Sequence, residues 1–505
     1  LGHRWDFNFN ARLYPNTDPS QSSPTSIMSY DGSGFAFEYT DSASAGIWRC
    51  DGINDTITYS NGKFTRRTKE GFQYVYAACS DNAQRWRLEK MEDRNGNVQS
   101  FSYSATTTSG RLNQVVDTNG RPYAISYLSS GRIDEISDFG TSPRKIKYEY
   151  SSSSGDLVRV RELSAESGLE RSTLYSYTTA GSHGHLVATI TDPKQSAEAV
   201  PVPFVRNYYD TNGKCLVQEY GAGAETEEDP APSSNAYAWS YGSGDTTFTD
   251  RNGTQIKFYF DNAGMCTKKE WQHGTPKPAI QYWYDSKGNL TKLEKNNGSR
   301  LHYTYDAESN LTESSSTDSS DDNELTWSYE YESTYNQVTR AVDPSNLIST
   351  FEYDSSGNLT KTIVDQGSGS GYQNLTSEFH YTSTGLMDWS KDPRGIKTTY
   401  QYTSDNYLWK VTEDADTGGM AVTSVEYAYD QFGNVTSVKD SLGRTTTMTV
   451  NRLNQVTKVT SPASFSYETE YHYDPSDNLT KVCVENAGGN GTSGFVIDTY
   501  YDILD

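Results

Sequence analysis

A tyrosine-centred peptide recurs along the second half of the chain, and its spacing constrains the fold more than any other feature. The peptide reads YDSSGNLTK at residues 353–361 and YDSKGNLTK at residues 284–292, and YDQFGNVTS and YDPSDNLTK follow further on. From Tyr305 onward the aromatic position returns in steps that mostly alternate between about 21 and about 27 residues, a period typical of repeat architectures. One structural unit is therefore expected to recur along the chain.

Each copy of the peptide has the pattern of a β-hairpin. Polar and apolar residues alternate over residues 349–353, a turn follows at residues 354–357, and a second alternating segment spans residues 358–364. Alternation with a period of two indicates a strand with one buried face. The Asp354 carboxylate is expected to accept backbone N–H groups in an Asx turn, and Gly357 is expected to take the positive φ that closes the turn.

We assign these residues a structural role in the repeat and no catalytic role. The residues of this motif are Tyr284, Asp285, Gly288, Tyr305, Asp306, Tyr353, Asp354, Gly357, Tyr429, Asp430, Gly433, Tyr473 and Asp474.

The composition favours a large β structure over a disordered chain. Apolar residues make up only 34% of the sequence, but 39 tyrosines fall at regular places, and disordered chains are poor in aromatic residues. Turns at both ends of every strand predict a continuous antiparallel meander, and a long open sheet twists and curls. We therefore predict an all-β fold, a long antiparallel meander of hairpins coiled into a spiral hollow shell, a cocoon-like barrel, with tyrosines lining its inside.

The charge balance excludes some classes of partner. The chain has 43 basic and 66 acidic residues, a formal net charge of −23, whereas a nucleic-acid partner would require a basic stripe. No apolar run approaches the roughly 18 residues of a membrane helix, and the first residues lack the pattern of a signal peptide. We expect no nucleic-acid partner and no membrane insertion.

The sequence offers no pattern typical of a metal, cofactor or nucleophile site. The five cysteines have no CxxC spacing; Cys50 with Cys79, or Cys215 with Cys266, could form disulfides, and free thiols are an equal alternative. His183 and His185 are interpreted as part of a polar loop and not as metal ligands. We therefore predict a protein that is not an enzyme and that binds neither a cofactor nor a metal.

One catalytic alternative involves a tyrosine beside a histidine, as in β-eliminating polysaccharide lyases. The candidates lie at His302-Tyr303-Thr304-Tyr305 and at Tyr471-His472-Tyr473. Since the same tyrosine position recurs in repeats that have no histidine, packing is the favoured interpretation and the lyase is the least favoured function.

The motif resembles that of the Rhs/YD-repeat family, which is named for the Tyr-Asp dipeptide found here at residues 284–285, 305–306, 353–354, 429–430 and 473–474. This family includes bacterial Rhs shell proteins and is related to the teneurin YD shell and to insecticidal toxin-complex cocoon proteins. The opening LGHRWDFNFNARL also resembles the segment that precedes the repeats in bacterial Rhs proteins.

The resemblance suggests three regions. Residues 1–100 are an N-terminal Rhs-associated β region that leads into the shell. Residues 101–280 hold degenerate repeats with an acidic loop near residues 225–234, and residues 281–505 hold regular repeats that are truncated at the C-terminus.

The function implied by the resemblance is a non-enzymatic shell fragment that encloses a C-terminal, often toxic, effector polypeptide of the same protein. Interior tyrosine hydroxyls would offer polar contacts to that cargo. The DPxG letters at residues 392–395 lie between ordinary repeats and are not expected to be the family's cleavage motif. The localisation implied is secreted or cell-surface in a bacterium, with loading in the cytoplasm. The alternative is a cell-surface structural or adhesion module that self-associates or binds glycans.

Overall fold

The structure is a computed structural model. It describes residues 11–16, 24–31, 36–41, 46–50, 53–79, 82–104, 110–163, 170–178, 184–221, 236–274, 276–319, 324–367, 371–413, 423–484 and 495–498. The acidic segment at residues 225–234, His183, and the start of a further repeat at residues 501–505 lie outside these described residues.

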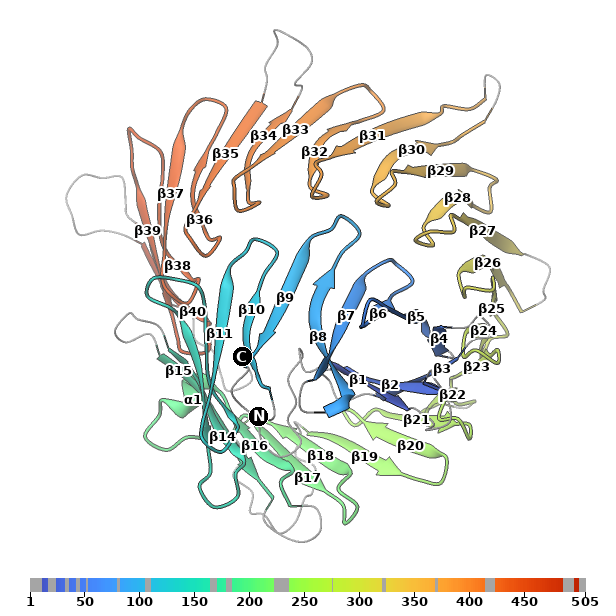
Figure 1. The fold of residues 1–505 in the computed structure, drawn as a ribbon, viewed down its shortest axis with the longest axis horizontal. Coiled ribbons are helices and arrows are strands. Elements are labelled where there is room, and N and C mark those ends of the chain that lie inside the picture. The colour runs from blue at the N-terminus through green and yellow to red at the C-terminus, as the bar shows by residue number, and fades with distance from the viewer. Residues whose placement is uncertain are drawn as a thin grey trace. The chain divides into compact units, whose positions relative to one another are not determined.

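The described residues form 41 strands in one sheet (Figure 1), and almost every pairing joins antiparallel strands that are consecutive in sequence. The predicted all-β class and continuous antiparallel meander are thereby confirmed. The single described helix, α1 (Pro193–Ser196), begins after Asp192, whose carboxylate caps it by accepting the N–H of Gln195. No helix in the described part of the chain is long and apolar enough to cross a membrane.

Contacts divide the chain into two units, and each unit combines an early and a late segment. The first unit contains the described residues of 121–239, its early segment, and of 396–498, its late segment. The second unit contains the described residues of 11–120 and of 240–395, again early and late. The predicted division into residues 1–100, 101–280 and 281–505 remains a prediction.

The strands of the early segments have the following bounds: β1 (Arg12–Asn16), β2 (Ser26–Tyr30), β3 (Ala36–Asp41), β4 (Ile47–Cys50), β5 (Ile53–Ser60), β6 (Lys63–Arg67), β7 (Gln73–Cys79), β8 (Asn82–Glu92), β9 (Val98–Tyr103), β10 (Leu112–Val116), β11 (Pro122–Tyr127), β12 (Ile133–Ser137), β13 (Lys145–Tyr150), β14 (Leu157–Leu163), β15 (Glu170–Tyr177), β16 (Val187–Thr191), β17 (Val205–Tyr209), β18 (Cys215–Tyr220) and β19 (Ala236–Tyr241).

Those of the late segments are β20 (Asp245–Thr249), β21 (Gln255–Phe260), β22 (Cys266–Trp271), β23 (Ala279–Tyr284), β24 (Leu290–Lys295), β25 (Arg300–Tyr305), β26 (Leu311–Thr317), β27 (Leu325–Tyr331), β28 (Val338–Val342), β29 (Ile348–Tyr353), β30 (Leu359–Val364), β31 (Leu375–Tyr381), β32 (Met387–Lys391), β33 (Lys397–Tyr402), β34 (Leu408–Glu413), β35 (Thr423–Tyr429), β36 (Val435–Lys439), β37 (Thr445–Val450), β38 (Val456–Thr460), β39 (Glu468–Tyr473), β40 (Leu479–Val484) and β41 (Phe495–Asp498).

The first eight strands of the second unit close on themselves (Figure 1, blue). Each strand from β1 to β8 pairs with the next, and β1 also pairs with β8, where Leu13 lies opposite Trp86. Eight antiparallel strands closed in this way form a small up-and-down barrel. The sequence predicts a sheet coiled into a shell but gives no indication that the first eight strands close among themselves.

The long strand β8 serves both the closed barrel and the meander that follows. Its residues near Trp86 pair with β1, whereas Lys90 and Met91 pair with Ser100 and Gln99 of β9. Between these stretches the register against β7 shifts, because Val75 lies opposite Lys90 and Tyr76 opposite Leu88. A bulge of this kind bends a strand and increases its twist, which allows β8 to pair with β1 in the barrel and with β9 in the meander.

The fully buried apolar core is concentrated in this barrel. Leu13, Ile27, Tyr39, Ile57 and Tyr76 each have 0% of their surface exposed. By contrast, no hydrophobic side chain among the described residues of 281–484 is buried. The regular repeats therefore depend on hydrogen bonds and on half-buried side chains more than on a dry core.

Candidate functional site

The site that the sequence singles out is the turn of each hairpin, and its aspartate organises the turn. In the copy at residues 353–358, Asp354 Oδ1 accepts the backbone N–H groups of Ser356 and Asn358, both at 2.9 Å. Asp354 Oδ2 accepts the Asn358 side-chain amide at 2.9 Å. Gly357 has a φ of 78°, a conformation that a residue with a Cβ rarely adopts. This is the hydrogen bonding of an Asx turn.

The same arrangement recurs at the other motif aspartates. Their Oδ1 atoms accept the backbone N–H groups two and four residues later, in Asp285, Asp306, Asp430 and Asp474. Where the repeat lacks glycine, a small polar residue takes the positive φ instead. These residues are Ser309, with a φ of 58°, and Asp477, with a φ of 71°.

The motif tyrosines join each hairpin to the one before it. The Tyr331 hydroxyl donates to the Leu311 carbonyl at 2.7 Å, and the Tyr353 hydroxyl donates to the Val338 carbonyl at 2.6 Å. Each acceptor opens the second strand of the preceding hairpin, at a register shift where it lies opposite the preceding motif tyrosine, as Leu311 lies opposite Tyr305. The bulge therefore presents a carbonyl to the hydroxyl of the next hairpin.

This link extends into the degenerate repeats, where the repeat motif is weak in the sequence. The hydroxyls with equivalent bonds, at 2.5–2.9 Å, belong to Tyr103, Tyr150, Tyr177, Tyr209, Tyr284, Tyr305, Tyr429 and Tyr473. A backbone carbonyl already accepts the proton of each of these hydroxyls, so these tyrosines would meet an enclosed chain as acceptors and not as donors; contact with such a chain stays a prediction.

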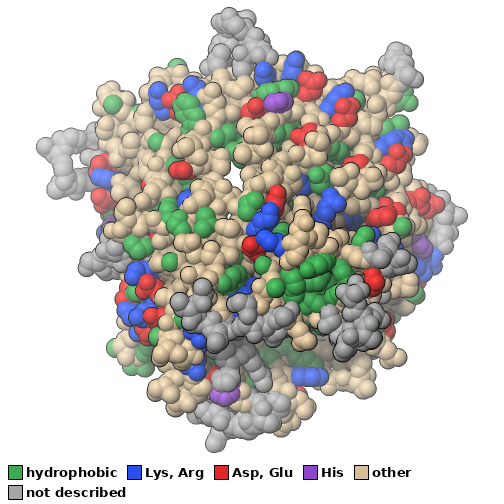
Figure 2. Space-filling view, in the orientation of Figure 1, with side chains coloured by type: hydrophobic (Ala, Val, Ile, Leu, Met, Phe, Trp, Pro, Cys, Tyr) green, Lys and Arg blue, Asp and Glu red, His purple; other side chains and the backbone are tan. Residues whose placement is uncertain are grey.

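The two faces of the repeat sheet differ in character. The motif tyrosines are half-buried, whereas the residue immediately before each motif aromatic is exposed in β23, β25, β27, β29, β31, β33, β35, β37 and β39. The exposed face carries paired charges, such as Lys410 and Lys439 with Glu426 at 3.0 and 3.1 Å. Figure 2 likewise shows acidic and basic side chains interspersed on the visible surface.

Asparagine side chains join neighbouring turns. The Asn310 amide donates to the Asn336 Oδ1 atom at 3.1 Å, and the Asn434 amide donates to the Asn454 Oδ1 atom at 2.9 Å. The asparagine of the NLT sequence is therefore part of a ladder of turns.

In the second unit, Tyr335 joins a late turn to the early segment. The guanidinium carbons of Arg67 and Arg94 lie 5.5 and 5.4 Å from the centre of its ring, close enough for cation–π attraction. Arg67 also donates to the Thr334 carbonyl at 3.0 Å. A Cβ added at Gly71 would lie 2.5 Å from the Tyr335 ring, so the glycine is required for this close approach.

In the first unit, Phe432 has the equivalent role. The guanidinium carbons of Arg144 and Arg452 lie 4.0 and 4.9 Å from the centre of its ring, and Phe139 contacts it at 5.8 Å between ring centres. Arg144 also donates to Asn454 at 2.6 Å. We call Tyr335 and Phe432, each with its two arginines, the arginine–aromatic clasps.

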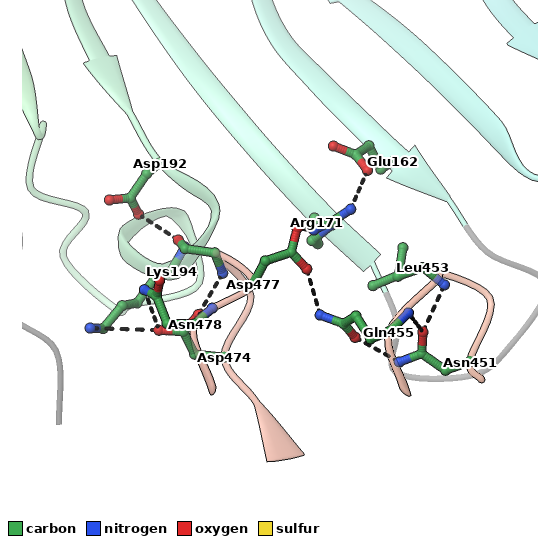
Figure 3. A network of polar contacts seen from close by, with 11 residues as sticks. Glu162, Arg171, Asp192, Lys194, Asn451, Leu453, Gln455, Asp474, Asp477 and Asn478 are labelled. Atoms are coloured by element: carbon green, nitrogen blue, oxygen red, sulfur yellow. Dashed lines mark hydrogen bonds and ion pairs between the residues drawn. The ribbon is translucent and has the colours of Figure 1, made fainter. Parts of the chain in front are cut away.

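Further polar contacts join the two segments of the first unit (Figure 3). Arg171 of β15 forms an ion pair with Glu162 at 2.6 Å and a second ion pair with Asp477 in a late turn. Lys194 Nζ of α1 lies 3.6 Å from Asp474 Oδ2, and the backbone N–H of Lys194 donates to the Ser476 hydroxyl at 2.9 Å. Strands and turns about 300 residues apart are thus held together.

The histidines and cysteines do not gather into a site in the described residues. His302 and His472 are exposed, and the motif hydroxyls of Tyr305 and Tyr473 in the same strands donate to backbone carbonyls. His185 Nδ1 lies 2.8 Å from the buried Asp156 carboxylate. Among the described residues no cluster of three or more potential metal ligands is present, and the five cysteines are free thiols.

The DPxG letters at residues 392–395 form an ordinary turn. The Gly395 N–H donates to the Asp392 carbonyl at 2.9 Å, and the Asp392 carboxylate accepts the N–H of Arg394 at 2.9 Å. The local geometry is that of the motif turns, as the sequence predicts.

The tyrosine links are expected to contribute measurably to stability. Replacing Tyr353 with Phe removes one buried hydroxyl and leaves the Val338 carbonyl without that donor, so we expect a loss of about 1 kcal/mol. Thermal unfolding followed by circular dichroism measures this change. Tyr303→Phe is the matched control, and an equal loss in both variants would contradict the assigned role of the link.

The pKa shifts predict loss of stability at both ends of the pH scale. Burial opposes ionisation of Asp354, but hydrogen bonds from Asn358 and Ser356 outweigh it and lower the pKa below the ordinary 3.8. Stability from this group is therefore complete above about pH 4 and is lost as the pH falls through the lowered value.

Burial raises the pKa of Tyr305 and Tyr353 above 10.0. The stability that these two tyrosines contribute is therefore complete below pH 10 and is lost as the pH rises. Unfolding temperatures measured from pH 2 to pH 12 should form a plateau between these limits, and a profile that peaks sharply near pH 7 would contradict the prediction.

Comparison with known proteins identifies similar chains. A family model described as Teneurin YD-shell matches residues 241–402. The match to the crystal structure of TcdB2-TccC3 has a TM-score of 0.60 and a sequence identity of 12%. It covers 97% of this chain and 28% of the TcdB2-TccC3 chain. The match to the TcdB2-TccC3-Cdc42 crystal structure has a TM-score of 0.58 and a sequence identity of 14%. It covers 97% of this chain and 27% of the solved chain.

The match to the structure of a Tc holotoxin pore from Photorhabdus luminescens has a TM-score of 0.58 and a sequence identity of 13%. It covers 97% of this chain and 26% of the solved chain. At such low identity these matches show a shared fold alone. This chain spans about a quarter of the length of the solved chains. No curated protein sequence matches it.

Proposed function

We propose that the chain forms the wall of a container for a polypeptide. The repeat motif, the YD-shell match over residues 241–402 and the shared fold support a shell of the Rhs/YD-repeat family. The enclosed cargo is a C-terminal, toxic segment of the same protein. The whole protein is bacterial, is loaded in the cytoplasm, and is secreted or delivered to the cell surface. The wall acts sterically, by keeping the cargo away from its target and from proteases until delivery.

The observation that carries this proposal is the joining of early to late turns within each unit. A container must resist opening between stretches of wall that are distant in sequence. The Arg67–Tyr335 and Arg144–Phe432 contacts of the clasps, together with the Arg171–Asp477 ion pair, join residues about 270–310 positions apart. Such contacts support a wall that stays closed.

A non-catalytic role is supported by the state of two tyrosines in the strands that contain the candidate histidines. The hydroxyls of Tyr305 and Tyr473 donate to backbone carbonyls, and burial raises the pKa of both phenols. A lyase base must lose its proton readily near its working pH, and these tyrosines are poorly suited to that task. A uronate-polymer panel assayed for unsaturated products is expected to give no signal, and a signal abolished by His302→Ala or His472→Ala would contradict this.

Limited proteolysis of the complete natural protein tests the container. We expect the segment that follows the repeats to survive protease concentrations that degrade the same segment expressed alone. Phe432→Ala removes the ring of one clasp and should increase cleavage of that segment. Arg340→Met, on the exposed face, is the matched control and should leave the protection unchanged.

The proposal would be overturned if protease cleaved the segment that follows the repeats equally fast in the complete protein and when it is expressed alone. Binding of the same protein preparation to a glycan array tests the alternative function, a cell-surface adhesion module. Strong binding to one glycan, together with an unprotected following segment, would favour a surface adhesion module.

A further inference from the structure

A cavity lies in the first unit where a late turn meets the early strands. Its volume is about 280 Å³, close to the lower end of the range of ligand pockets. Ile136 of β12, Ile146 of β13 and Leu163 of β14 form walls on the early side, and Leu453 closes the cavity from the turn between β37 and β38. The walls are therefore apolar and come from both segments.

The charged residues that line the cavity are mostly basic, although the whole chain carries a net charge of −23. Arg144, Lys145, Arg171 and Arg452 line it, against two acidic residues, Asp138 and Glu162. Asp138 pairs with Arg144 at 2.6 Å, and Glu162 pairs with Arg171 at 2.6 Å. Outside the lining, Lys145 pairs with Glu135 at 2.9 Å and Arg171 pairs with Asp477. The lining itself carries two more basic than acidic side chains.

Arg171 gives a second, independent sign of a missing acceptor. Its side chain is 13% exposed, and its two terminal nitrogens contact Glu162 and Asp477 (Figure 3). Its Nε atom is buried and has no hydrogen-bond partner. A buried donor without a partner is costly, and each such group calls for an explanation, of which a bound water, ion or small molecule is one.

We propose that this cavity binds a small organic carboxylate with an apolar body. The apolar part would contact Ile136, Ile146 and Leu453, and the carboxylate would accept hydrogen bonds from the arginines, which are the preferred partners of carboxylates. A bound ligand would contact both segments of the unit at once. If the protein acts as the proposed container, such a ligand strengthens the wall at this position; binding itself does not depend on that function.

Calorimetric titration of the complete chain tests the site. The probes are phenylacetate, 4-methylpentanoate and indole-3-acetate, and phenylacetamide is the neutral counterpart of the first. We expect at least one carboxylate to bind, phenylacetamide to bind at least tenfold more weakly than phenylacetate when phenylacetate is the ligand, and the unfolding temperature to rise with ligand concentration.

Three variants locate the binding. Leu453→Trp fills the cavity, and Arg171→Lys keeps the charge but removes the Nε donor; each should weaken binding at least tenfold. Arg444→Gln changes an arginine that is 60% exposed in the preceding turn and should leave binding unchanged. Circular dichroism of each variant verifies that it folds.

Failure of all three carboxylates to bind overturns the proposal, as does equal binding of phenylacetamide and phenylacetate. Undiminished binding to folded Leu453→Trp places the ligand elsewhere and also overturns it. Because proteolytic protection of the cargo is measured separately and without ligand, failure of this site is distinguishable from failure of the container.

Discussion

Replacing Arg66 with Met should destabilise the protein by about 3–5 kcal/mol, because it leaves the buried Asp55 carboxylate without its cation. Arg66 Nε lies 2.9 Å from Asp55 Oδ2 inside the eight-stranded barrel, where the side chains are only 18% and 10% exposed. Burial raises the pKa of Asp55 even with Arg66 present. The measurement is the free energy of unfolding from urea denaturation at pH 8.

The pH dependence of this defect distinguishes a lost charge from lost packing. A raised pKa means that stability is complete below the ordinary value of 3.8 and is lost as the pH rises through the folded value. The defect of Arg66→Met should therefore shrink between pH 8 and pH 5, as Asp55 becomes protonated. Adding Asp55→Leu should recover most of the loss.

Arg340→Met is the matched control for Arg66→Met. Arg340 pairs with Glu330 at 3.0 Å on the exposed face, where the side chains are 36% and 64% exposed. A pair of this kind contributes about 0–1 kcal/mol. Equal defects in the two variants would show that the barrel pair has no special role.

Replacing Trp86 with Ala should cost about 3–5 kcal/mol through the cavity that it leaves. Trp86 is 9% exposed and packs against Phe64 and Tyr59, with ring centres 4.7 and 5.9 Å away. It also lies opposite Leu13, where the barrel closes. Urea denaturation followed by tryptophan fluorescence and circular dichroism measures the loss.

Trp283→Ala provides a same-size truncation in the repeats. Trp283 is 38% exposed and its principal described contact is Lys292 Nζ, 4.3 Å from the ring. We expect a loss of about 1 kcal/mol, mainly that of a cation–π contact. A larger loss for Trp283→Ala than for Trp86→Ala would contradict the assignment of the packed core to the barrel.

The hairpins could be predicted from sequence because their causes are local. The alternation at residues 349–353 fixes the face of each side chain, and Asp354 and Gly357 fix the turn within five residues. Neighbouring strands then pair simply because the turns are short. The fold class follows from this repetition.

The link from Tyr353 to Val338 could not be predicted in the same way. It depends on a register shift in the preceding hairpin, and one extra residue in a strand leaves no clear mark in the sequence. The repeat pattern identifies the tyrosine, but it predicts a contact between the hydroxyl and an enclosed polypeptide. Its real partner is a backbone atom, which no side-chain pattern reveals.

The contacts between early and late segments were also missed, for a different reason. Phe432 and Tyr335 occupy variable positions of their turns, where the repeat gives no signal. Their partners Arg144 and Arg67 lie hundreds of residues away, and a single sequence carries no information on such pairs. Closure of β1 on β8 is equally non-local.

That closure has a consequence for how copies of the chain meet. The outermost strand of a sheet normally presents unpaired N–H and C=O groups that recruit strands from other molecules. At Arg12 and Leu13, β1 already has neighbours on both sides, Tyr30 and Ser29 on one and Arg87 and Trp86 on the other. At these residues the beginning of the meander offers no template for strand addition, so it is protected against edge-to-edge aggregation.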